Sequence, residues 1–391
     1  MANPHSLRAS EATSTHPDAL VALAEVIDEL MSSIGPSPDA VVLFLTAHHA
    51  SAASHILREI HKRLSPDCLT GCTVASVVGG GREHQAGPGL SIWAARMPGS
   101  RVQAFHVAFN EDAGVVAGWP DVGEKASAVF LADPFSFPLE PFFASLRSRE
   151  RFPSLVGGIA SGANRAGGNL LFCDTKIYAQ GGVGFVLKGA ARIEPLVSHG
   201  CRPVGNSFRV TSCQRNQLIE LGGRPAYESL REVLEGLSDV DRQRFMNGPQ
   251  VGIQAVRNRT GEKGPSYLVR GVVGVDAESG TISLADVVRD GAVLQFHARD
   301  AETAHEDFDS LCAMANSYYP DAAGALMFLC TGRGLSLFQR SDHDIEILQK
   351  YFPDLPTSGF FAAGEIGPIC GLPYVHGLTA CVGLLVPQDD S

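Results

Sequence analysis

The sequence predicts an α/β protein of mixed α and β character, built as two intertwined domains on mixed sheets flanked by helices. Three observations support this prediction. Short apolar runs typical of buried strands alternate with segments of helical periodicity along the 391 residues. Glycines, of which there are 42, separate many of these segments. The same succession of segments occurs three times, which predicts internal βα–loop–β repeats.

Each predicted repeat begins with an apolar run that contains Phe-Leu: residues 41–45, 129–131 and 326–329. A segment of helical character follows, and then a glycine that is expected to form a turn: Gly71, Gly157 and Gly359. A strand-like run closes each repeat: residues 90–95, 183–187 and 378–386. Because such a unit buries only one face by itself, we expect the three to pack on one another.

The N-terminal part contains two further features. Residues 1–17 are small and polar with two prolines, and we expect a disordered leader. From Asp18 to Ile34, apolar residues form a helical stripe, with Asp18 as the N-cap.

In the second repeat, residues 169–178 and 183–187 are predicted to pair as a hairpin.

A boundary at residue 235 divides the chain into an N-terminal domain, residues 18–235, and a C-terminal domain, residues 236–391. The second domain is expected to contain strands near 250–256, 267–275 and 293–298. Asp300 is predicted to cap a long helix. In the last repeat, Ser341 and Asp344 are expected to form a capping box for a helix that ends at Tyr351.

Charge and composition restrict the classes of function. A net charge of −11 disfavours nucleic acid and anionic membrane surfaces as partners, since both attract a basic face. No apolar run approaches the ~20 residues that span a bilayer, and no signal-peptide pattern is present. Nine cysteines without a CxxC pair are typical of a reducing compartment, so we expect a cytoplasmic protein.

Motifs for catalysis, metals and nucleotides are incomplete. No GxSxG is present, and Cys330 with His376 is the conceivable nucleophile and base, although a core position is favoured for Cys330. The histidines of the first repeat lack the i,i+4 spacing of a metal site and are expected on a solvated helix face: His48, His49, His55 and His61. The glycine-rich stretches match no phosphate-binding motif. We therefore predict no catalytic residue, metal or cofactor.

Arg333 and Glu365 are the principal candidates for binding a ligand. Arg333 follows Gly332 directly after an apolar strand, where ligands of open α/β sheets collect. Its planar guanidinium suits a carboxylate or phosphate. Glu365 follows Gly364 among apolar residues, so it is expected either to be paired or to face a ligand. Arg333 is its most natural partner, and one salt bridge could explain both residues without a ligand.

Two further residues complete the predicted site. His376 precedes a strand and is a candidate ligand-binding residue, with a structural role as the alternative. Arg299, beside Asp300 at a strand-to-helix junction, is expected to act as an anchor more than as a catalyst. The predicted ligand-binding set is therefore Arg333, Glu365, His376, Gly332, Gly364 and Arg299.

Separated stretches of the chain resemble the FIST family, named for F-box and intracellular signal-transduction proteins. The first half is similar to the family's N-terminal domain at residues 69–72, 155–158 and 198–205. The second half is similar to its C-terminal domain at residues 268–272, 296–301, 330–334 and 359–368. The resemblance implies a sensory module that binds a small ligand, such as an amino acid or a related metabolite, in a cleft between domains.

The resemblance also implies alternatives and partners. Some family members bind haem and report nitric oxide, and in that case His376, His297 and His199 are the candidate axial ligands. Family members are often fused to, or encoded beside, kinases, cyclases or chemotaxis receptors, and in eukaryotes they are fused to an F-box. Because no output domain is recognised in the sequence, we expect a separate signalling partner or a homo-oligomer. A hydrolase-type enzyme and a purely structural protein are the remaining alternatives.

Overall fold

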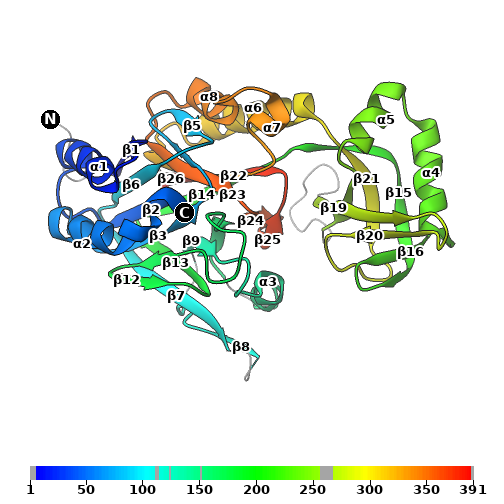
Figure 1. The fold of residues 1–391 in the computed structure, drawn as a ribbon, viewed down its shortest axis with the longest axis horizontal. Coiled ribbons are helices and arrows are strands. Elements are labelled where there is room, and N and C mark those ends of the chain that lie inside the picture. Colours follow the sequence, from blue (N-terminus) through cyan, green and yellow to red (C-terminus); the bar gives the residue numbers. More distant parts are fainter. Residues whose placement is uncertain (1–5, 111–113, 123–124, 150–151, 256–266, 389–391) are drawn as a thin grey trace. The chain divides into compact units, whose positions relative to one another are not determined.

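The computed structural model describes residues 6–110, 114–122, 125–149, 152–255 and 267–388, and confirms a mixed α/β fold with helices on mixed sheets (Figure 1). The chain forms two compact units. Unit 1 comprises residues 1–198, 308–375 and 379–391, and unit 2 comprises residues 199–307 and 376–378. Residues 235 and 236, the expected domain boundary, both lie in helix α4 (Ala226–Gly236) of unit 2.

Unit 1 is built on three sheets. The first has the order β1 (Arg8–Ser14), β6 (Leu90–Arg96), β2 (Ala40–Thr46), β3 (Leu69–Val74), β11 (Leu171–Cys173) and β12 (Lys176–Tyr178). The second has the order β25 (Leu372–His376), β24 (Glu365–Ile369), β10 (Ser154–Ile159), β9 (Ser127–Ala132), β13 (Gly182–Gly189), β7 (Ser100–Asn110) and β8 (Val115–Ala117). The third has the order β14 (Ala191–His199), β26 (Thr379–Pro387), β22 (Gly324–Cys330), β23 (Thr357–Ala362), β4 (Val77–Gly79) and β5 (Arg82–His84).

The three segments expected to be repeats have the same strand pairings. In each, two strands are parallel neighbours and a later strand pairs antiparallel with the first of them: β2 and β3 with β6, β9 and β10 with β13, β22 and β23 with β26. The hairpin that follows the second strand joins another sheet: β4–β5 pairs with β23, β11–β12 with β3, and β24–β25 with β10. This exchange links all three sheets by main-chain hydrogen bonds.

The glycines expected in turns instead lie inside the second parallel strand of each segment: Gly71 in β3, Gly157 in β10 and Gly359 in β23. A Cβ atom at these positions would lie 2.0, 1.8 and 1.8 Å from the carbonyl oxygens of Leu43, Phe130 and Met327 on the neighbouring strand. Each glycine is therefore needed for the close approach of two strands rather than for a turn.

The apolar faces of the three sheets meet in one core. The rings of Phe44, Phe328 and Phe360 pack with centroids 5.0–6.4 Å apart, and Val129 and Phe185 of the second sheet join them. Full burial of such side chains stabilises a fold by roughly 1.5–3 kcal/mol each. Because the core draws on all three sheets, unit 1 is one interdependent body.

Helices cover the outer faces of these sheets. Helices α1 (Ala19–Ser33) and α2 (Ala53–Arg63) pack on the first sheet, and the short 3₁₀ helix η1 (Ala47–Ala52) precedes α2. Helix α3 (Leu139–Arg147) packs on the second. The third sheet is covered by α6 (Ala301–Tyr318) and α8 (His343–Tyr351), with the short α7 (Leu335–Phe338) nearby (Figure 1).

Unit 2 is built on one antiparallel sheet. Its strands follow the order β15 (Cys201–Gln214), β21 (Val293–Arg299), β18 (Gln250–Gln254), β19 (Tyr267–Asp276), β20 (Thr281–Leu284), β16 (Gln217–Leu221) and β17 (Arg224–Pro225). Strand β15 also pairs with β16, so the sheet closes on itself. Helices α4 and α5 (Asp239–Met246) bury Leu230 and Phe245 against this sheet, beside Phe296.

Two predictions about the N-terminal part have opposite outcomes. The N-cap of α1 is confirmed, since Asp18 Oδ1 accepts hydrogen bonds from the N–H of Leu20 at 2.8 Å and of Val21 at 3.2 Å. The disordered leader is wrong for residues 8–14, which form β1 and pair along their whole length with β6. Alternate residues of β1 are buried. In a short segment of small polar residues, this alternation is too weak to predict a strand from the sequence. Residues 1–5 lie outside the described part.

Candidate functional site

A buried group of charged side chains lies at the carboxyl ends of β22 and β23 in unit 1. The two strands are parallel, so these ends meet at one edge of the sheet. Arg333 follows the end of β22 by three residues and is 1% exposed, and Glu365 follows the end of β23 by three residues and is 0% exposed. Thr331 and Ala363, immediately after the two strands, are exposed. The buried side chains of Arg333 and Glu365 are therefore only two residues away in sequence from exposed residues, but they are themselves shielded from solvent.

The partner of Arg333 is Asp344 of α8. The guanidinium Nε donates to Oδ2 and Nη2 donates to Oδ1, both at 2.8 Å, and both side chains are fully buried. Such a bidentate pair is among the strongest polar contacts in proteins. The rings of Phe338 and Phe308 lie beside the guanidinium carbon at 5.2 and 6.0 Å from their centroids. The salt bridge expected between Arg333 and Glu365 is thus replaced by one between Arg333 and Asp344.

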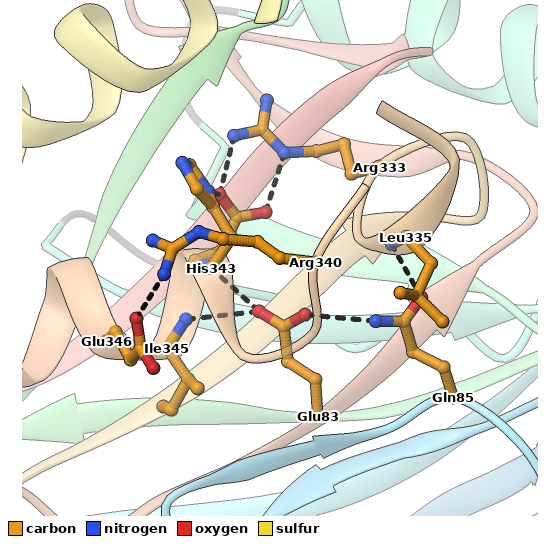
Figure 2. Close-up of polar contacts among 9 residues, drawn as sticks. Glu83, Gln85, Arg333, Leu335, Arg340, His343, Ile345 and Glu346 are labelled. Atoms are coloured by element: carbon orange, nitrogen blue, oxygen red, sulfur yellow. Dashed lines mark hydrogen bonds and ion pairs between the residues drawn. The ribbon is translucent and has the colours of Figure 1, made fainter. Parts of the chain in front are cut away.

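Glu83 of β5 lies between Ile345 of α8 and Gln85, and contacts both (Figure 2). Its Oε1 accepts hydrogen bonds from the main-chain N–H of Asp344 at 2.8 Å and of Ile345 at 3.2 Å. Its Oε2 accepts from Gln85 Nε2 at 3.3 Å, and Gln85 Oε1 accepts from the N–H of Leu335 at 3.0 Å. Glu83 therefore satisfies the N-terminus of α8, where a negative charge is favoured.

The capping box expected from Ser341 and Asp344 is wrong. The residue before α8 is Asp342, which has a left-handed backbone with φ 62° and makes no side-chain cap. Its Oδ1 instead accepts a hydrogen bond from the N–H of Glu83 at 2.7 Å. The capping carboxylate comes from a strand 261 residues away from Asp344, so no local pattern predicts it.

The carboxyl groups of this cluster have different proton affinities. Burial, and the negative charge of Asp344, raise the pKa of Glu83 to about 7, although its main-chain hydrogen bonds act in the opposite direction. Burial also acts to raise the pKa of Asp344, but the charge and hydrogen bonds of Arg333 outweigh it and hold that pKa below its usual range. Burial raises the pKa of Glu365 above its usual range, against hydrogen bonds from Thr379 and the charge of Arg333.

Within the described part of the chain, Arg333 and Glu365 each have one buried hydrogen-bonding atom without a partner. Oε2 of Glu365 accepts from the N–H of Thr379 at 3.2 Å and from its Oγ1 at 2.5 Å. Among the described residues, neither Glu365 Oε1 nor Arg333 Nη1 has a hydrogen-bond partner, and both atoms are buried. A buried unsatisfied polar group costs about 1–3 kcal/mol. The cluster therefore contains one buried guanidinium N–H group and one buried carboxyl oxygen whose hydrogen-bonding capacity is unused.

The two glycines of the predicted set serve the fold through their main chains. The N–H of Gly332 donates to Cys330 Sγ at 3.4 Å. The carbonyl oxygen of Gly364 accepts from the N–H of Ile159 at 2.8 Å, which joins β10 to the start of β24. These contacts position Arg333 and Glu365, because each glycine directly precedes one of them.

Comparison with known proteins decides the family. A FIST N domain matches residues 39–224 and a FIST C domain matches residues 226–368. The chain belongs to the FIST family. FIST domains are associated with sensors of signal transduction. Among the residues that the structure describes, no helix is long and apolar enough to cross a membrane.

Relatives of this FIST chain occur in mycobacteria and in mammals. The uncharacterized protein Mb0898c of Mycobacterium bovis is 34% identical over 377 residues, which is 95% of this chain and 97% of that protein. The uncharacterized protein Rv0628c of Mycobacterium tuberculosis is 33% identical over 385 residues, 97% of this chain and 100% of that protein. Human F-box only protein 22 is 31% identical over 140 residues, 35% of this chain and 32% of that protein.

The remaining predicted residues of the FIST chain, His376 and Arg299, are assigned to unit 2, and His376 is also the last residue of β25. His376 is buried, and its ring lies 5.4 Å from the ring of His199 in an edge-to-face contact. His297 is 2% exposed, and its burial lowers its pKa. Among the described residues, no group of three or more His, Cys, Asp or Glu side chains could hold a metal ion. Haem binding through these histidines stays a prediction.

The solvated face expected for the histidines of the first repeat is wrong for His49. This residue lies in η1 rather than on α2, and its side chain is fully buried, whereas His48 and His55 are exposed. The apolar strand β2 leads directly into η1, which turns His49 inward. Of the unit 1 cluster, sequence reasoning missed Glu83 and Gln85 and misassigned Asp344, whose only sequence signal was its place near a helix start.

Proposed function

We propose that this FIST protein is a sensor that binds a small zwitterionic metabolite, an amino acid or a related compound, at Arg333 and Glu365. The observation that carries the proposal is the unused donor on Arg333 and the unused acceptor on Glu365. A ligand carboxylate would accept from Arg333 Nη1, and a ligand ammonium would donate to Glu365 Oε1. Asp344 and Thr379 hold the two side chains in place beforehand, which lowers the entropic cost of binding.

Entry of a ligand requires residues 334–342, which follow Arg333, to move, because the side chains of Arg333 and Glu365 are closed to solvent. This segment contains the four-residue helix α7 and three residues with positive φ: Gly334, Gln339 and Asp342. Leu335 is 53% exposed, and the segment is tied to the β4–β5 hairpin through single contacts to Gln85 and Glu83. Few buried contacts favour local opening. Closure of this segment over a ligand would then be the change that a signalling partner reads.

A proton is released when such a ligand binds. Burial raises the pKa of Glu365, so its carboxyl group tends to be protonated near neutral pH. A ligand ammonium binds the ionised form, and the positive charge of the ligand lowers that pKa in the complex. Affinity is therefore expected to rise as the pH rises towards the pKa of the free protein's Glu365, and to level off above it.

Isothermal titration calorimetry with the individual amino acids tests the proposal. The test compares the wild-type chain with Glu365→Gln and Arg333→Lys, and uses Arg340→Lys as the matched control, since Arg340 pairs with Glu346 on the surface of the same segment. We expect one amino acid or a related group to bind the wild type and the control, with at least tenfold weaker binding to Glu365→Gln, which corresponds to about 1.4 kcal/mol. Equal affinity for a folded Glu365→Gln variant would contradict the proposed site.

The proposal places the protein in the cytoplasm, where it would report a metabolite to a kinase, cyclase or chemotaxis component, either alone or as a homo-oligomer. The family association with signal-transduction sensors supports a partner of this kind.

A further inference from the structure

We propose that unit 2 carries a second site, which binds the carboxylate or phosphate group of a small organic anion through Arg299 beside His297. The two residues lie two positions apart on β21, so their side chains leave the same face of the sheet. Phe296, which precedes His297, and Ala298, which lies between the two residues, are buried in the core of unit 2. Arg299 and His297 therefore lie on the outer face of the closed sheet.

Two glycines form the floor under these side chains. A Cβ atom on Gly252 of β18 would lie 2.2 Å from Cε1 of His297, so no other residue leaves room for the imidazole there. The N–H of Gly252 donates to His297 Nδ1 at 3.1 Å. Gly248 lies under Arg299, where a Cβ atom would be 3.8 Å from the side-chain Cδ. The imidazole of His297 thus rests against the main chain of β18, and the Arg299 side chain lies beside Gly248, two residues before that strand.

The donors that Arg299 leaves unused form the edge of the guanidinium best suited to an anion. Its Nε and Nη2 are buried and have no hydrogen-bond partner among the residues that the structure describes. These are the same two atoms through which Arg333 holds the carboxylate of Asp344, with both distances at 2.8 Å. This edge presents two parallel N–H groups that match a carboxylate or phosphate.

The neighbouring acidic residue does not neutralise Arg299. The carboxylate of Asp300 caps α6 through a hydrogen bond from Glu302 N–H at 3.0 Å. It also pairs with Arg244 Nη1 at 2.7 Å and with Arg202 Nε at 3.4 Å. Asp300 is thus shared between two other arginines and a helix N-terminus, and Arg299 keeps its charge available for a ligand.

Side chains next to this site are fixed by hydrogen bonds, which is the condition for a pre-organised subsite. The ring of Tyr267 lies 5.0 Å from the ring of His297. Tyr267 Oη donates to Gln295 Oε1 at 2.9 Å, and Gln295 Nε2 donates to the carbonyl oxygen of Gly205 at 2.7 Å. The two rings provide an apolar side for the body of the ligand, while Arg299 takes its anionic group.

Calorimetric titration of the full chain with inorganic phosphate, and separately with acetate, tests this site. The comparison uses Arg299→Gln, Arg299→Lys and the control Arg209→Gln, because Arg209 is an exposed arginine of the same unit. We expect at least one anion to bind the wild type, with at least tenfold weaker binding to Arg299→Gln and weaker binding to Arg299→Lys, which keeps the charge but loses the fork. Binding of phosphate alone or acetate alone identifies the group that is recognised.

Two results would overturn the proposal. One is the absence of binding of either anion to the wild type up to roughly 10 mM, a concentration that detects even millimolar dissociation constants. The other is equal affinity for the wild type and a folded Arg299→Gln variant, which would indicate a non-specific charge effect. Glu365→Gln serves as a separate reference, because it removes the site proposed in unit 1 and is expected to leave this anion binding unchanged.

Discussion

Replacement of Glu83 by Gln tests how a buried carboxylate at the start of α8 makes the stability of this protein depend on pH. Glu83 is 4% exposed and accepts two main-chain hydrogen bonds from that helix. Its pKa is raised from 4.5 to about 7 in the folded protein, by burial and then by the charge of Asp344. The folded protein therefore binds a proton at Glu83 more tightly than the unfolded chain does.

The sign and size of the effect follow from this difference. Because the folded-state pKa is the higher one, the stabilisation due to protonated Glu83 is fully present below pH 4.5 and is lost as the pH rises to about 7. At 1.36 kcal/mol per pKa unit, the loss amounts to roughly 3 kcal/mol. Glutamine cannot ionise, so Glu83→Gln removes this loss. The free energy of unfolding of the variant, relative to the wild type, should rise by roughly 2.5 kcal/mol between pH 5 and pH 8, because part of the loss already occurs below pH 5.

Urea unfolding of the wild type and Glu83→Gln at several pH values, followed by circular dichroism, measures this difference directly. Glu11 and Glu365 also have raised pKa values and contribute to the pH dependence of both proteins, so the comparison isolates Glu83. Glu228→Gln, at an exposed site on α4, is the control. A difference between the wild type and Glu83→Gln that stays constant from pH 5 to pH 8 would refute this description of the α8 cap.

Two other substitutions test the packing of unit 1 and the ion pair within it. Gly157→Ala places a Cβ atom 1.8 Å from a carbonyl oxygen and should destabilise the protein by roughly 3 kcal/mol in denaturant unfolding. Gly236→Ala, whose Cβ atom meets open space, is the control and should be neutral or slightly stabilising. Equal destabilisation by the two substitutions would contradict the close strand contact at Gly157. Asp344→Asn leaves the charge of Arg333 buried without its ion-pair partner and should cost about 3–5 kcal/mol, most of which the apolar pair Arg333→Met with Asp344→Leu should restore. If the double variant does not recover stability, the loss in Asp344→Asn is not explained by the unpaired buried charge of Arg333.

Features with a local cause were predictable from the sequence. The Asp18 cap of α1 and the Asp300 cap of α6 depend on side chains within three residues of the helix start, and both are confirmed. The position of Arg333 at a strand end was also predictable, because apolar strand and polar turn are adjacent in the chain. The mixed α/β fold and the FIST family were correctly predicted in the same way, from segments that each carry their own pattern.

Features that depend on distant segments had no such signal. The hairpin β4–β5 pairs with β23, and Glu83 from this hairpin caps α8, in place of the nearby Ser341. Asp344 looked like part of that local cap, whereas its carboxylate pairs with Arg333 in the folded chain. β1 was missed because its alternation of small polar residues becomes a strand only when β6 lies beside it.

Native mass spectrometry of the protein purified from its own host, with an absorbance scan of the same sample, tests ligand sensing most directly. We expect a retained mass in the range of an amino acid or a related metabolite, present in the wild type and in Arg340→Lys and lost in Glu365→Gln. A Soret band would instead favour haem and direct attention to His376, His297 and His199. A wild-type protein that carries no ligand, and that binds none of the amino acids in solution, would contradict the proposed function.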